Sequence, residues 1–529
     1  MSYDLIIKNG RVMDGTGNSW YHADIGIIGD TIKTIGKIGE AEKTIDASGH
    51  IVTSGFIDIH SHSDFPILID PKAQSKIRQG VTTEVIGQCG NSAAPMNESV
   101  KQYRIKFRSS NVPKGFQYDW ASMDSYMKRI DRQGAALNIA PVIGHGTIRQ
   151  NIMGYENREP TETELEEMRK LVKGAMEDGA WGMSTGLIYP PSVYGKQPEI
   201  TELAKVVAEY DGVYFSHIRG EGETLLEAVT EACEIGRDSN TPVQIAHFKA
   251  SGKPYWGKTK ESLALVKKYR GTGVEVTFDQ YPYIASSTGL TAMLPHWSQE
   301  GGAEKLMEYL QDPAMRKKMA EGMRLNYEWT AVLVTNAKNN QQYNGKNIQE
   351  VADMMNKDPL TAFFDLLVME NTQVPSVMFG MNEEDVQRVM QSPYGMVGSD
   401  GSAIAPEGIW ANNVPHPRLY GTFPRVLGHY ARDEGVLSLQ EAVRKMTGAP
   451  AQKLGFKDRG LLREGYKADI TVFNPETVKD VATFTNPQRY PAGIRYVIVN
   501  GKIVVEKGEH TGALPGKALR KDSLCLEVF

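Results

Sequence analysis

The stretch GFIDIHSHSD, residues 55–64, is an apolar run that ends on two histidines separated by one serine. Successive side chains of an extended strand point to opposite faces, so His60 and His62 share one face while Ser61 points away. Two imidazoles on one face can bind a single metal ion. Two polar residues that merely close a strand would show the same pattern. The interpretation therefore depends on further ligands elsewhere in the chain.

The length and composition are those of a large globular protein. The 529 residues are 40% hydrophobic and 23% charged, enough for a large barrel and a smaller second domain. The net charge of -5 gives no electrostatic reason to expect nucleic acid or an anionic membrane as partner. The chain shows no signal-peptide pattern and no apolar run long enough to span a bilayer. We therefore expect a cytoplasmic protein that acts on a small molecule.

The cysteines are too few for a disulfide framework, which fits a reducing compartment. Cys233 lies in a helical pattern and reads as a small buried apolar residue, and Cys525 lies in the C-terminal tail. Cys89 differs, because it follows the strand-like run VTTEVIG and is flanked by glycines in GQCGN. Glycines permit a turn in which the intervening side chain faces a pocket. Cys89 is the thiol for which we expect a chemical role.

The hydrophobic pattern divides the chain into three parts. Residues 1–54 hold short alternating runs separated by Asn-Gly, Gly-Asp and Ser-Gly turns, which is typical of a small β-sheet. Residues 55–450 alternate strand-like runs with amphipathic helices, and residues 451–529 return to short strands. We expect the two terminal parts to form one β-sandwich beside the middle part.

Eight strand-like runs occur in the middle part of the chain. They are GFIDIH, TTEVIG, LNIAPVIGHG, WGMSTG, VYFSHI, PVQIAHF, VEVTFDQ and GMVGSD. Eight strands separated by helices predict an α/β protein with a parallel (β/α)8 TIM-like barrel, and a doubly wound α/β fold is the alternative. One helix has a clear start, where Thr161 and Glu164 can form a capping box. Residues 286–347 are too many for one connection, so we expect an inserted, lid-like segment or a peripheral decoration there.

Ligand-type side chains stand at the predicted C-terminal ends of these strands, where barrel active sites lie. They are His60, His62, Cys89, His217, His247 and Asp400. A single histidine is more often a satisfied core or capping residue, but six convergent side chains predict a metal site at the barrel mouth. A metal there would activate water and polarise a carbonyl. Asp400 is the natural proton carrier to the departing nitrogen, and His145 is the next candidate.

These residues also carry a family resemblance. The segments GFIDIHSHSD, GQCGN, WGMSTGLIYPP, FSHIRGEGE, IAHFKASG, FDQYPY, GSDG and HPRLYGTFPRVLG resemble the D-aminoacylase (N-acyl-D-amino-acid deacylase) branch of the amidohydrolase superfamily. The resemblance extends over nearly the whole chain and includes the superfamily's β-sandwich. It implies zinc-dependent hydrolysis of the amide bond of N-acyl-D-amino acids, which yields a D-amino acid and a carboxylic acid.

The resemblance also implies how the ligands divide. One zinc would be held tightly by Cys89, His217 and His247. A second, weaker site, bridged by Cys89, would use His60, His62 and Asp400. Many relatives outside this branch carry a lysine at the end of strand 4, but here that strand ends in Met183, Ser184 and Thr185. The thiolate of Cys89 takes over the bridging task, and soft sulfur suits zinc.

Substrate recognition requires a cation for the free carboxylate of an N-acyl amino acid. Arg418 in PHPRLYG can supply a bidentate pair, and Lys249, two residues after His247, can add a point charge. The resemblance implies both residues as substrate ligands, together with Tyr281 and Ser287.

Two other functions remain open. A cyclic-amide hydrolase would resemble hydantoinases and dihydroorotases, but the missing strand-4 lysine and the Cys89 motif argue against it. A non-catalytic metal-binding barrel is the third interpretation, since a fold does not determine a function. The complete ligand set with Asp400 argues against that interpretation. The sequence leaves open the preferred side chain and acyl group, the number of metals in the active form and the oligomeric state.

Overall fold

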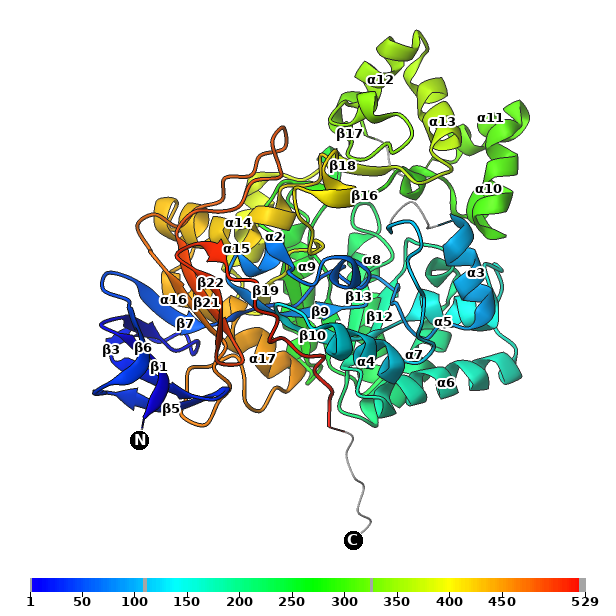
Figure 1. Ribbon diagram of the computed structural model, residues 1–529. Coiled ribbons are helices and arrows are strands. Elements are labelled where there is room, and N and C mark those ends of the chain that lie inside the picture. Colours follow the sequence, from blue (N-terminus) through cyan, green and yellow to red (C-terminus); the bar gives the residue numbers. More distant parts are fainter. Residues whose placement is uncertain (1, 108–111, 324–326, 523–529) are drawn as a thin grey trace.

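The eight predicted strand runs form a parallel barrel at the centre of the molecule (Figure 1). The computed structural model describes residues 2–107, 112–323 and 327–522, so Cys525 lies outside the described residues. The barrel strands are β8 (Phe56–Asp58), β9 (Val81–Ile86), β10 (Asn138–Pro141), β11 (Ile143–Gly144), β12 (Gly182–Gly186), β13 (Val213–His217), β14 (Val243–Ile245), β15 (Val276–Gln280) and β19 (Gly395–Val397). The third run is divided at Val142, because β10 pairs with β9 and β11 pairs with β12. The predicted (β/α)8 fold is confirmed.

Backbone contacts between the first and last strand runs close the barrel just beyond β8 and β19. Ser61 forms a parallel bridge with Gly401. The amide of Asp400 donates to the carbonyl of His60, and the amide of His62 donates to the carbonyl of Gly401, both at 2.9 Å. The ligand candidates of the first and eighth strands are therefore neighbours because the barrel closes between them.

Helices lie between the barrel strands and after the last of them. Outside the insertion they are α1 (Pro66–Ile69), α2 (Gln74–Ile77), α3 (Glu98–Phe107), α4 (Met123–Gln133), α5 (His145–Ile152), α6 (Glu162–Glu177), α7 (Gln197–Ala208), α8 (Leu225–Ser239), α9 (Thr259–Gly271), α14 (Glu383–Gln391), α15 (Arg418–Arg425), η9 (Val426–Asp433), α16 (Leu439–Met446) and α17 (Gly448–Leu454). The predicted capping box at the start of α6 is confirmed, because Thr161 and Glu164 each accept a hydrogen bond from the other's backbone amide. Cys233 is buried in α8, as expected.

Two packed sheets lie beside the barrel, at the left of Figure 1, and strands from both ends of the chain build them. The first sheet has the order β5 (Thr31–Gly36), β4 (Asp24–Ile28), β1 (Tyr3–Lys8), β6 (Ala41–Asp46). The second has the order β23 (Glu509–His510), β22 (Lys502–Glu506), β21 (Ile494–Val499), β20 (Ile470–Phe473), β7 (Ile51–Ser54), β2 (Arg11–Met13), β3 (Tyr21–His22). Thr53 of β7 pairs with Thr471 of β20, so the terminal segments form one β-sandwich.

Gly55 joins the sandwich strand β7 to the barrel strand β8. A Cβ atom at this position would lie 2.1 Å from Oγ1 of Thr82, so a side chain here would clash with the Thr82 side chain. The amide of Gly55 also donates to the carbonyl of Asp469 at 2.8 Å. The C-terminal part of the chain thus contacts the start of the strand that carries the two histidines.

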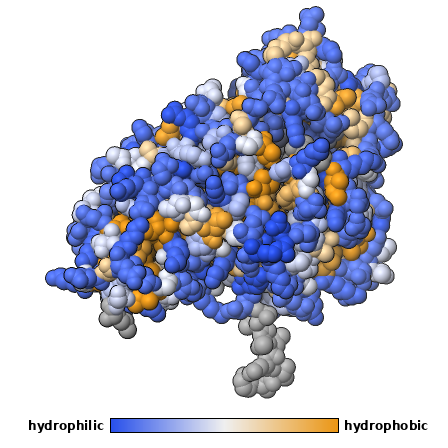
Figure 2. Space-filling model, viewed as in Figure 1, coloured by the Kyte–Doolittle hydropathy of each residue, from blue (hydrophilic) through white to orange (hydrophobic). Residues whose placement is uncertain are grey.

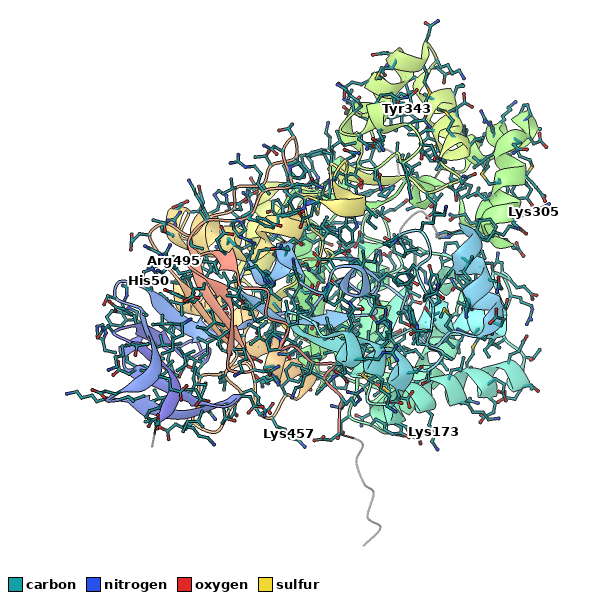
Figure 3. The ribbon with its side chains drawn as sticks, in the orientation of Figure 1. His50, Lys173, Lys305, Tyr343, Lys457 and Arg495 are labelled. Carbon is teal, nitrogen blue, oxygen red and sulfur yellow. The ribbon has the colours of Figure 1, made fainter. Side chains whose placement is uncertain are left out.

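Between β15 and β19 the chain builds a separate unit, at the upper right of Figure 1. Its elements are β16 (Ala285–Gly289), α10 (Gly302–Gln311), α11 (Pro313–Glu321), β17 (Val332–Val334), α12 (Ile348–Met355), α13 (Pro359–Met369) and β18 (Pro375–Phe379). The labelled Lys305 and Tyr343 lie in this unit in Figure 3. It has an apolar core of its own, which includes Leu310, Phe363 and Leu367.

The surface in view is mostly hydrophilic, with apolar residues in separate patches (Figure 2). Among the residues that the structure describes, no helix has the length and apolar character required to cross a bilayer.

Candidate metal centre

The six predicted ligands meet at the C-terminal end of the barrel in two groups that share one thiol. The first group is Cys89, His217 and His247, and the second is His60, His62, Cys89 and Asp400. The ligand atoms within each group all lie within 4.8 Å of one another. Sγ of Cys89 lies 3.4 Å from Nε2 of His60 and 3.7 Å from Nε2 of His247, so it stands between the two groups.

Each group has donors that suit zinc. In the first group, Nδ1 of His217 lies 2.8 Å from Nε2 of His247, with the Cys89 thiol beside them. In the second, Oδ1 of Asp400 lies 2.9 Å from Nε2 of His62 and 3.5 Å from Nε2 of His60. Thiolate, imidazole and carboxylate in sets of three or four are the ligands of zinc sites in proteins. The residues present therefore fit this metal.

Three of these donors have a left-handed backbone. The φ angles are +53° at Cys89, +35° at His247 and +48° at Asp400. Such conformations cost a residue with a side chain on the order of 1–3 kcal/mol. Uncommon backbone at functional positions indicates that the surrounding structure imposes the geometry. Here it turns the chain at the end of strands β9, β14 and β19, where the donors converge.

The end of strand β12 packs directly on the turn that carries Cys89. The amide of Gly90 donates to Oγ of Ser184 at 3.0 Å. A Cβ atom on Gly186 would lie 2.1 Å from the carbonyl oxygen of Cys89, so this approach requires glycine. The thiol turn therefore occupies the space beside the end of strand 4.

The electrostatics of the centre favour a cation. Burial acts to raise the pKa of the Cys89 thiol, but the positive charge of His60 and hydrogen bonds from neighbouring histidines hold it well below its ordinary value. Burial likewise acts to raise the pKa of Asp400, but the Arg418 guanidinium and the charge of His60 hold it well below its usual range. Both shifts favour the anionic form of the group, which is the form that binds a metal.

Three of the four predicted substrate ligands lie together beside the donor groups. Nη1 of Arg418 lies 2.9 Å from Oδ2 of Asp400, and Nη2 donates to the carbonyl of Ser287 at 3.3 Å. The guanidinium lies over the Tyr281 ring, 4.6 Å from its centroid. The Tyr281 hydroxyl is buried and has no hydrogen-bond partner among the described residues, which is uncommon for a buried hydroxyl.

Lys249 is engaged with protein groups. Its Nζ lies 2.5 Å from Oε1 of Glu221 and 2.7 Å from Nδ1 of His247. Sequence reasoning assigned no role to Glu221, nor to Asp279, which contacts His60. Both stand in motifs quoted above, FSHIRGEGE and FDQYPY. A carboxylate within a few residues of a predicted histidine ligand was the signal that could have identified Glu221.

A cavity of about 420 Å³ opens beside the donors. The barrel contributes His62, Asp400 and Arg418 to its wall, and the inserted unit contributes Ser287 and Thr335. This volume suits a small-molecule ligand.

The fold and the paired donor groups define a metal-binding (β/α)8 barrel with an attached β-sandwich. The Amidohydrolase family model matches residues 43–505, and the chain belongs to that family.

Three relatives are similar over nearly the whole chain. D-aminoacylase of Alcaligenes xylosoxydans xylosoxydans is 36% identical over 98% of this chain and 98% of that protein. N-acyl-D-glutamate deacylase of the same organism is 34% identical over 98% of this chain and 97% of that protein. The crystal structure of N-acyl-D-glutamate deacylase from Bordetella bronchiseptica, complexed with zinc and a phosphonate mimic of the tetrahedral intermediate, is 33% identical, with a TM-score of 0.82 and coverage of 98% and 100%. The resemblance stated from the sequence is confirmed.

Proposed function

We propose that the protein is a zinc-dependent N-acyl-D-amino-acid deacylase, which hydrolyses a linear amide to a D-amino acid and a carboxylic acid. The observation that carries this proposal is the pair of donor groups that share Cys89, with Arg418 placed 2.9 Å from Asp400. The names of the similar proteins support the substrate class, and the zinc in one similar structure supports the metal.

We assign the tightly bound zinc to Cys89, His217 and His247. We assign a second, weaker site to His60, His62 and Asp400, with Cys89 as the bridge. When bound there, zinc supplies a water that is activated at neutral pH and polarises the carbonyl of the scissile amide.

Asp400 is the proton carrier in this proposal. Its carboxylate accepts the proton of the attacking water and delivers it to the amide nitrogen as the C–N bond breaks. The nitrogen then leaves as a neutral amine instead of an amide anion. Contacts of 2.9 Å to His62 on Oδ1 and to Arg418 on Oδ2 hold the carboxylate in place.

The α-carboxylate of the substrate is recognised by Arg418, whose planar guanidinium matches a carboxylate in a bidentate pair. The buried hydroxyl of Tyr281 donates a further hydrogen bond. Ser287 contributes at the rim of the cavity, and Lys249 adds positive charge beside His247. The free carboxylate is the feature that distinguishes this substrate class from simple amides.

A substrate panel with metal analysis tests this proposal. The protein, with its zinc content measured, is assayed with N-acetyl-D-amino acids, their L enantiomers, N-acyl-D-glutamate and hydantoins. We expect turnover of N-acyl-D-amino acids and none of hydantoins. Hydantoin hydrolysis would instead favour a cyclic-amide hydrolase, and a zinc-loaded protein without any turnover would favour a binding barrel. Faster turnover of L enantiomers would contradict the assigned chirality.

A further inference from the structure

Two carboxylates lie behind the donor groups, and each contacts a different ligand histidine at the nitrogen that faces away from the donors. Asp279, in strand β15, has no solvent exposure. Its Oδ1 lies 3.0 Å from Nδ1 of His60 and accepts the backbone amide of His247 at 2.8 Å. Its Oδ2 accepts the side-chain amide of Gln244 at 3.1 Å. The three partners His60, Gln244 and His247 all belong to the barrel.

The Asp279 contact determines which nitrogen of His60 can bind a metal. A carboxylate accepts a hydrogen bond, so the proton of the imidazole stands on Nδ1. In the neutral imidazole, the form that binds a metal, the lone pair is then on Nε2, which lies 3.4 Å from Sγ of Cys89 and 3.5 Å from Oδ1 of Asp400. Asp279 therefore presents the His60 donor to the second group.

Glu221 has the equivalent position behind His247. Its Oε1 lies 3.0 Å from Nδ1 of His247, and this side chain is 16% exposed. Nε2 of His247 lies 2.8 Å from Nδ1 of His217 and 3.7 Å from Sγ of Cys89. Nζ of Lys249 lies 2.7 Å from Nδ1 of His247 and 2.5 Å from Oε1 of Glu221. An ammonium only donates, so Glu221 is the acceptor among these groups and presents His247 to the first group.

We propose that Asp279 and Glu221 are positioning residues with separate duties. Glu221 orients His247 for the tight site, and Asp279 orients His60 for the weaker site. Asp279 also holds the backbone amide of His247, where φ is +35°, so one carboxylate contacts both sites. This inference rests on the metal assignment of the proposed function. Carboxylates that bind the second nitrogen of a ligand histidine typically change metal affinity by about 10–100-fold when removed.

Zinc titration of the metal-stripped protein against a competing chelator tests whether each carboxylate affects a different metal site. Glu221→Gln is expected to weaken the tight site by about 10–100-fold and the second site by less than about threefold. Asp279→Asn is expected to weaken the second site by about 10–100-fold and the tight site by less than about threefold. The amide oxygen of asparagine can still accept the hydrogen bond from the His247 backbone amide, but the charge facing His60 is lost. Glu199→Gln is the matched control, since Glu199 is a buried carboxylate that contacts His145 and Arg149 but none of the six donors. It should leave both affinities unchanged.

Cobalt substitution supplies a readout that does not depend on activity. Ligation of Co²⁺ by a thiolate gives a charge-transfer absorption, which should persist at full intensity in Asp279→Asn, because Cys89, His217 and His247 remain. Equal weakening of both sites by each variant, or unchanged affinities in both, would overturn the proposal. If Asp279→Asn does not fold, the zinc affinities of Glu221→Gln test the proposal, because the partly exposed Glu221 side chain is less critical for folding. Equal weakening of both sites in that variant, or no weakening of the tight site, would overturn it.

The same titration separates this inference from the proposed function. A parent protein that binds no zinc would overturn the metal assignment and this inference with it. A parent protein that binds zinc at two separable affinities but hydrolyses no N-acyl amino acid would overturn the proposed reaction alone. The selective effects of the two carboxylates would then still stand.

Discussion

Replacing Asp400 by asparagine tests the proton carrier with little change in shape. Asparagine is nearly isosteric, and like aspartate it tolerates a left-handed backbone, which the φ of +48° at this position requires. The hydrogen bond from the amide of residue 400 to the carbonyl of His60 involves the main chain only. We therefore expect the closure between the first and last strands to survive.

The expected loss follows from the contacts of the carboxylate. The asparagine oxygen can still accept the hydrogen bond from His62, but the amide cannot pair with Arg418 and cannot carry a proton. General acid–base catalysis contributes about 10²–10⁴-fold, so kcat should fall at least about a hundredfold, or about 2.7 kcal/mol in the barrier. The tight zinc should remain, because Cys89, His217 and His247 are unchanged. KM should change little.

Steady-state kinetics over a range of pH, zinc analysis and thermal unfolding measure these quantities on one preparation. Asp385→Asn is a suitable control, because Asp385 is a buried carboxylate that contacts Thr259 and Arg388 outside the donor groups. It should retain the parent's kcat. Turnover of Asp400→Asn within a few-fold of the parent, with a pH profile of the same shape, would refute the assignment.

Such a result would move the proton transfer to another residue. His145 is a poor substitute, because its Nδ1 lies 2.8 Å from Ser192 and its Nε2 lies 2.8 Å from Glu199, both in a buried network. Both ring nitrogens are therefore engaged. His62, which lines the cavity, would be the next residue to replace.

Three further outcomes are expected. Cys89→Ala should lose zinc from both sites and with it activity, and elemental analysis that shows normal zinc with full turnover would remove the thiol from the centre. Arg418→Met should slow both substrate types, because both lose the contact that holds Asp400, but it should raise the activation free energy of kcat/KM by about 2–5 kcal/mol more for carboxylate substrates than for the corresponding amides, whereas equal losses would show a structural role. Lys76→Met should lower the free energy of unfolding by about 3–5 kcal/mol in urea titrations, because it leaves the buried Asp58 and Glu84 without their cation. Unchanged unfolding would contradict this ion-pair assignment.

Much of the fold and of the site could be predicted from local pattern. Alternating strand and helix periods determined the barrel, since each period requires its own buried face. The capping box of α6 depends on two residues three positions apart, which the chain brings together by itself. Parallel strands place their C-terminal ends on one rim, so residues at strand ends, such as His60 and His217, could be expected near one another before any distance was known.

The tertiary structure alone decided how those residues combine. Cys89 stands between two donor groups because the strand ends converge on it. The distances from its thiol to the other donors cannot be derived from the spacing of these residues in the sequence. The same holds for the buried pair of His60 and Asp279, whose positions are 219 residues apart. Lys249 was predicted as a substrate ligand from its position after His247, but its contact with Glu221 depends on the neighbouring strand. Contacts between distant segments depend on how the whole barrel packs and closes, and that information is not local to any motif.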